Sequence, residues 1–129
     1  MAKSKIITME IRKPVNEEEW LYRRGYSTPV KKYMNPDGTA TSRVFKLREI
    51  DNGELSVDVK SMTTPEKSIG DNQKYFLFEI HNKLVLEIGL LSFHEPLPDN
   101  AAHSVILGMT IEDEILPGRL ARNSKRIYI

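Results

Sequence analysis

The sequence contains no cysteine among its 129 residues. This absence excludes a disulfide framework, a thiolate nucleophile, and any zinc or iron–sulfur site with cysteine ligands. Histidine is scarce as well, and His81, His94 and His103 lack the i, i+4 spacing of paired metal ligands on a helix. We therefore expect no metal and no cofactor, and we expect a cytoplasmic location, with which the lack of cysteine is consistent.

Long apolar runs are also missing. The N-terminal segment MAKSKIITMEIRK carries a charge every few residues, which is not typical of a signal peptide. No stretch approaches the ~20 consecutive apolar residues that a membrane-spanning helix needs. We therefore expect neither secretion nor insertion into a membrane.

The sequence also lacks an excess of charge of one sign, because 19 basic and 18 acidic residues leave a net charge of +1. No overall field steers the protein toward nucleic acid or anionic lipid, so any such preference requires a local patch. With 40% hydrophobic and 29% charged residues, the composition is that of a globular protein. The length predicts one domain over residues 1–129 with a single core.

The most apolar part of the chain is Lys74 to Phe93. Phe78 and Ile80 lie at alternate positions, which predicts a strand with its apolar face inward. A three-residue break at 81–83 would return the following leucines to the same face, and so would make a hairpin. A helical turn over 84–87 between two strands is the alternative, and the sequence leaves both open.

Alternation of apolar and polar residues predicts most of the remaining structure. We expect an α+β fold, a single compact domain with a mostly antiparallel sheet of five to six strands, short helices and a long 26–41 loop. The expected strands cover residues 5–12, 43–50, 54–60, 75–80, 88–93 and 103–109. Residues 21–25 are typical of a further short strand. Residues 117–124 predict a last helix, followed by a strand at 126–129.

Two of these strands are predicted to pair as a hairpin around Asp51-Asn52-Gly53, where glycine can adopt a left-handed conformation. A three-residue loop places Phe45 opposite Val59 on one face of the hairpin. The other face then pairs Lys46 with Asp58, an opposite-charge pair on a solvated surface.

Four segments resemble a widespread, uncharacterised family of short prokaryotic proteins. They read LYRRG, NPDGTATSRVF, ELSVDV and EPLPDNAAHSVILG, and the match spans Leu21 to Gly108. LSVD followed by PxPxNxxHS is the most specific combination. The matching positions are Leu21, Tyr22, Arg23, Arg24, Gly38, Ser42, Phe45, Leu55, Ser56, Val57, Asp58, Pro96, Asn100, His103 and Ser104. This chain departs from the family at Arg43, Val44 and Ala101, and the resemblance implies relatedness without an activity.

The candidate site consists of five residues in these segments: Arg23, Ser42, Ser56, Asp58 and His103. Ser56, Asp58 and His103 have the chemistry of a nucleophile, an orienting acid and a base. Arginine on an early strand with serine on a later one is similar to ADP-ribosyltransferase-like sites, where arginine holds the pyrophosphate of NAD. The alternative is a structural network, in which Asp58 pairs with Lys46 and Arg23 bonds to its neighbours.

Two functions from different classes follow. The first is a protein-interaction module, an accessory component of a multi-protein prokaryotic system whose loops and sheet edge meet a partner protein. The second is a small nucleotide- or NAD-processing enzyme that uses the arginine, serine and histidine cluster. Nucleic acid is a less favoured partner, through a basic stripe predicted on the last helix. The stripe contains Arg119, Arg122, Lys125 and Arg126.

Overall fold

A seven-stranded antiparallel sheet organises the chain in the computed structural model, which describes residues 12–129. The strand order is β1-β5-β6-β3-β2-β4-β7. The strands are β1 (Lys13–Pro14), β2 (Trp20–Tyr26), β3 (Glu54–Val59), β4 (Tyr75–His81), β5 (Leu91–His94), β6 (His103–Leu107) and β7 (Lys125–Ile127). Together with a few short helices they form a single compact domain, so the α+β prediction is confirmed.

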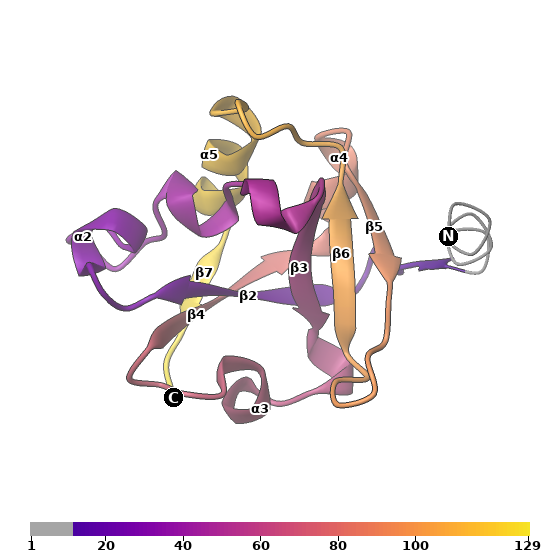
Figure 1. The fold of residues 1–129 in the computed structure, drawn as a ribbon, viewed down its shortest axis with the longest axis horizontal. Helices are drawn as coiled ribbons and strands as arrows, with labels where there is room; N and C mark the ends of the chain where they lie inside the picture. The colour runs from indigo at the N-terminus through magenta and orange to yellow at the C-terminus, as the bar shows by residue number, and fades with distance from the viewer. Residues whose placement is uncertain (1–11) are drawn as a thin grey trace.

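Short helices surround this sheet (Figure 1). They comprise the α-helices α2 (Val30–Tyr33), α3 (Pro65–Ile69), α4 (Asn82–Glu87) and α5 (Ile115–Arg122) and the 3-10 helices η1 (Ser42–Phe45), η2 (Glu49–Asp51) and η3 (Lys60–Met62). Thr64 caps α3 by accepting a hydrogen bond from the Lys67 amide, and Gly70 ends it at a positive φ of 70°. No helix within residues 12–129 has the length and apolar character needed to span a bilayer.

The core lies between the sheet and the helices α4, α5 and η1. Phe78 and Ile80 of β4 are fully buried there, so the inward face predicted for this strand is confirmed. Val85 of α4 and Leu120 of α5 close the same core from the helical side. A smaller cluster on the opposite face of β2 and β4 packs beneath α3. It contains Tyr22, Ile69 and Leu77.

The hairpin predicted between the strands of the 74–93 region is wrong. β4 pairs with β2 and β7, whereas β5 pairs with β1 and β6, and α4 connects the two strands. Buried Asn82 anchors the start of α4 by donating to the carbonyls of Val15 and Asn16 and accepting from Ser92. The helical turn left open at 84–87 is therefore what forms.

The strand predicted over 43–50 is also wrong, because this segment forms η1 and η2. Val44 and Phe45 are both buried in the same core, whereas adjacent strand residues point to opposite faces. Asp51 accepts hydrogen bonds from the Arg48 amide and side chain, which holds the second turn. The predicted hairpin is consequently absent, and β3 pairs with β2 and β6 instead.

The remaining predictions agree with the structure more closely. The strands at 54–60, 75–80 and 103–109 are confirmed as β3, β4 and β6, and the short strand at 21–25 as β2. The long 26–41 loop contains α2 and an Asn35 to Gly38 turn closed by a backbone hydrogen bond of 2.9 Å. The strand predicted at 5–12 falls almost wholly outside the described residues.

Candidate functional site

Two pockets meet at Arg23 and Arg24, which line both of them. The smaller, which we name the basic pocket, has a volume of about 310 Å³. Its polar lining consists of the cationic residues Arg23, Arg24, Arg43, Lys46 and Arg48 and the tyrosines Tyr26, Tyr33 and Tyr75. The larger, which we name the polar pocket, has a volume of about 730 Å³ and includes Ser56, Asp58 and His103.

The two pockets form where strands β2 and β3 separate. The strands pair only at Leu21 with Val59 and at Tyr22 with Asp58. From Arg23 onward β2 no longer pairs with β3, and the Arg23 side chain bonds to main-chain carbonyls instead. Its Nη1 donates to the carbonyl of Ser56 at 2.8 Å, and its Nε donates to the carbonyl of Val44 at 2.8 Å.

Arg23 is therefore held by main-chain carbonyls rather than by the side chains of the predicted cluster. Burial lowers the pKa of Arg23 to about 10, an effect that Asp51 opposes and that the nearby Arg48 and Arg24 reinforce. The guanidinium still carries its charge at neutral pH. It contributes both a structural link and a positive potential to the pockets.

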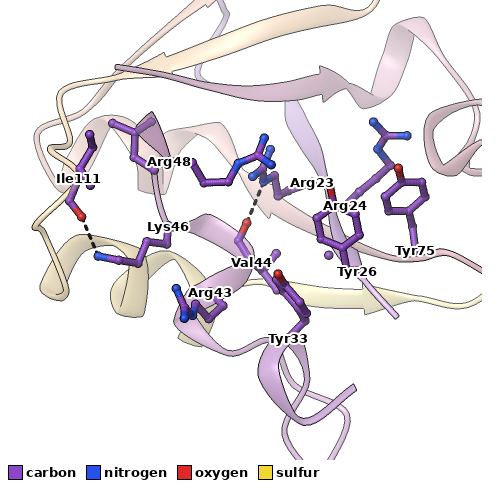
Figure 2. A pocket seen from close by; sticks show the side chains of 12 residues that line it. Arg23, Arg24, Tyr26, Tyr33, Arg43, Val44, Lys46, Arg48, Tyr75 and Ile111 are labelled. Carbon is purple, nitrogen blue, oxygen red and sulfur yellow. Dashed lines mark hydrogen bonds between the residues drawn. The ribbon is translucent and has the colours of Figure 1, made fainter. Parts of the chain in front are cut away.

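The basic pocket is lined by aromatic rings as well as by cations (Figure 2). The Tyr26 ring lies 5.5 Å from that of Tyr33 and 5.4 Å from that of Tyr75, measured between centroids. The Arg24 guanidinium lies 4.4 Å from the centroid of the Tyr75 ring, a cation–π arrangement. Flat apolar faces and positive charges therefore alternate on one concave surface.

The cations of the basic pocket differ in how they are already bonded. Lys46 Nζ donates to the carbonyls of Ile111 and Asp113, the first of which is drawn in Figure 2. Arg48 forms an ion pair of 3.1 Å with Asp51, whose hydrogen bond is the main reason that the pKa of Arg48 is raised. Within residues 12–129, Arg24 and Arg43 have no carboxylate partner. These two are the cations available to an anionic ligand.

In the polar pocket, the Asp58 carboxylate accepts hydrogen bonds from two neutral side chains. Its Oδ2 accepts from Ser68 Oγ at 2.7 Å and its Oδ1 accepts from Asn100 Nδ2 at 2.8 Å. The predicted pair of Asp58 with Lys46 is wrong, because Lys46 reaches the loop before α5 instead. Asp58 thus links β3 to α3 and to the 95–102 loop.

Four of the five predicted site residues lie together. Arg23, Ser56, Asp58 and His103 line the polar pocket, and the Ser56 hydroxyl lies 3.3 Å from His103 Nε2. Ser42 lies at the start of η1 and belongs to neither of the two pockets.

The basic stripe predicted on the last helix is not continuous. Helix α5 ends at Arg122, so Lys125 and Arg126 belong to β7. The Arg126 guanidinium lies 4.5 Å from the Phe76 ring and 4.4 Å from the Tyr128 ring, which encloses it between aromatic groups. Arg119 and Arg122 lie on α5, so only two of the four cations of the predicted stripe are on the helix.

The sequence pattern does not predict the basic pocket. Its tyrosines come from β2, α2 and β4, and its cations from β2, η1 and the residues after η1. The only signal is that the strings RRGY, KKY and SRVFKLR place basic residues beside aromatic or apolar ones.

Among residues 12–129, no group of three or more histidine, aspartate or glutamate side chains is arranged to hold a metal ion. Comparisons of the chain with protein-family models, with curated proteins and with solved structures find no match.

Proposed function

We propose that this protein is a cytoplasmic protein-interaction module, an accessory component of a multi-protein prokaryotic system. In this proposal the basic pocket receives an acidic segment of the partner protein. The observation that supports it is the pocket's lining: five cationic residues and three tyrosines, with no aspartate or glutamate among its described lining residues.

Arginine and tyrosine suit this role for different reasons. The guanidinium of arginine binds a carboxylate through two parallel hydrogen bonds, which fixes geometry as well as charge. Tyrosine offers a large contact area, and both residue types are enriched among those that dominate binding energy at interfaces. The net charge is only +1, so attraction of an acidic partner depends on this local concentration of cations.

A fluorescently labelled, short acidic peptide tests the proposal by anisotropy. We expect saturable binding that weakens as salt rises toward ~0.15 M, because surface charges are then screened. Arg24→Glu and Arg43→Glu should each weaken binding by about tenfold or more, a loss of about 1.4 kcal/mol. Arg119→Glu, which reverses a charge on α5 outside the pocket, is the matched control and should leave binding within about twofold.

Three outcomes contradict the proposal. The first is no saturable binding by the wild-type protein, and the second is equal weakening by Arg24→Glu and Arg119→Glu. The third is tighter binding of a single-stranded oligonucleotide of equal charge, which would assign the tyrosines and cations to base stacking and phosphate contact.

The second candidate is the nucleotide- or NAD-processing enzyme, which the grouping of Arg23, Ser56 and His103 in one pocket favours. The position of Ser42 outside that pocket weighs against it. Titration with NAD and ATP separates the candidates. Saturable nucleotide binding that is lost in folded Arg23→Ala and His103→Ala variants would favour the enzyme over the protein-interaction module.

A further inference from the structure

Ser56 and His103 form a hydrogen-bonded pair on the outward face of the sheet. In the β3–β6 ladder Ser56 is opposite Val105, and His103 is opposite Asp58. The two side chains are therefore diagonal neighbours on one face, within reach of each other. Ser56 Oγ lies 3.3 Å from His103 Nε2, a separation that is common for a nucleophile and its base before substrate binds.

The neighbouring backbone determines which nitrogen of His103 carries the proton. Nδ1 lies 2.8 Å from the carbonyl oxygen of Glu95, which can only accept a hydrogen bond. In the neutral ring Nδ1 is thus protonated and Nε2 has the free lone pair. The Ser56 hydroxyl consequently donates to Nε2, which is the arrangement that general-base catalysis requires.

A carboxylate is placed to stabilise the protonated ring. Glu95 Oε1 lies 3.8 Å from His103 Nδ1, and Arg12 forms an ion pair with the same carboxylate. If His103 accepts the serine proton, its positive charge faces the Glu95 side chain as well as the carbonyl. Glu95 is a positioning residue in this arrangement.

The Ser56 hydroxyl is accessible to solvent and contributes little to the stability of the fold. Ser56 is exposed, and its hydroxyl has no other hydrogen-bond partner among residues 12–129. Removing the hydroxyl leaves no buried group unpaired. Arg23 lines the same pocket, and a guanidinium has five N–H donors, of which the carbonyls of Val44 and Ser56 occupy two.

We propose that Ser56 is a nucleophile activated by His103, and that the polar pocket hydrolyses carboxylic esters. Ser56 Oγ bonds to the acyl carbon while its proton moves to His103 Nε2. The bond between the acyl carbon and the alcohol oxygen then breaks, and the alcohol leaves with that proton. Water attacks the acyl-serine with His103 again as base, which releases the acid and restores Ser56. The step needs neither a cofactor nor a redox partner.

The remaining donors of Arg23 give the pocket a positive group for the developing oxyanion. This inference does not depend on the proposed binding of an acidic segment, because that proposal concerns the basic pocket. The two sites are distinguishable by probe: an acidic peptide for one and a serine-directed electrophile for the other.

A fluorophosphonate probe tests the inference, since it phosphonylates activated serines with loss of fluoride. Incubation of the full chain, followed by peptide mass spectrometry, should give one adduct, on Ser56. Ser56→Ala should abolish labelling. His103→Gln, which keeps a polar side chain, should slow it about 100-fold, the scale of general-base assistance.

Ser61→Ala is the matched control, because Ser61 is another exposed serine but lines neither of the two pockets. Its labelling rate should equal that of the wild type. Absence of labelling in the wild-type protein, or labelling at another residue, overturns the proposal. An unchanged labelling rate in a folded His103→Gln variant overturns the role of His103 as base.

Discussion

Arg23 and Ser56 are joined by a 2.8 Å hydrogen bond from the guanidinium Nη1 to the main-chain carbonyl, across the point where β2 leaves β3. The bond replaces a ladder hydrogen bond that the diverging strand no longer supplies. A second bond, to the Val44 carbonyl, ties the same side chain to η1. One arginine thus connects three elements and forms the boundary between the basic and polar pockets.

Arg23→Ala should therefore lower stability by about 2–4 kcal/mol, because two carbonyls lose a charged donor. Chemical denaturation measures this change. Arg24→Ala, which removes the neighbouring and exposed guanidinium, should cost less than about 1 kcal/mol. Equal losses of stability from the two substitutions would show that the hydrogen bonds of Arg23 do not stabilise the junction of β2 and β3.

Gly25→Ala should destabilise the protein by about 1–3 kcal/mol, because an added methyl group overpacks the contact between β2 and η1. The new Cβ would lie 3.0 Å from Val44 Cγ2 and 3.4 Å from Phe78 Cε2. The thermal melting temperature measures the loss.

Gly118→Ala is the control for this prediction. Its Cβ would meet only the end of the flexible Arg122 side chain at 3.3 Å, and alanine favours the helical conformation by about 0.5–1 kcal/mol. We expect Gly118→Ala to be neutral or stabilising. A neutral Gly25→Ala would mean that η1 does not pack as closely as described.

Phe78→Ala should cost about 3–5 kcal/mol, because the ring is fully buried and its removal leaves a cavity. Lys46→Ala should cost about 1–2 kcal/mol, more than an exposed charge, since Lys46 holds the Ile111 and Asp113 carbonyls. Urea denaturation of both variants decides the order. A smaller loss of stability for Phe78→Ala than for Lys46→Ala would contradict the burial of Phe78 in the core.

Acid stability should depend on Asp37, which lies in the turn that begins at Asn35. The Thr39 hydroxyl and amide donate to its carboxylate, and these bonds lower the pKa of Asp37. A lowered pKa contributes stability above the unfolded value, and that stability is lost as pH falls through the folded value. Asp37→Asn should flatten the decline of melting temperature as the pH falls below the ordinary pKa of aspartate. Identical slopes for the variant and the wild type would count against this hydrogen bonding.

Alternation in the sequence predicts β4, whose Phe78 and Ile80 point into the main core while Leu77 packs in the smaller cluster on the opposite face. It fails where neighbours are buried in the same core, as Val44 and Phe45 are, because only a turn or helix places adjacent side chains on one core. It is ambiguous for Leu84 and Ile88, whose spacing fits both a strand and a helix.

The polar pocket was more predictable than the basic pocket. Ser56, Asp58 and His103 meet through direct pairing of β3 with β6, and all three lie in segments of the predicted site. The basic pocket depends on the divergence of β2 from β3 and on the path of the 26–41 loop. Neither is encoded in a local pattern, so the grouping of Tyr26 with Tyr33 was not foreseen.

The central claim is that an acidic partner segment binds in the basic pocket, and an NMR titration tests it most directly. A short acidic peptide is added to the isotope-labelled protein, and backbone amide shifts are followed. We predict that the largest shifts occur at Gly25, Tyr26, Val44 and Leu47, which line the pocket. Largest shifts on α5 instead, or no shifts at peptide excess, would contradict the account.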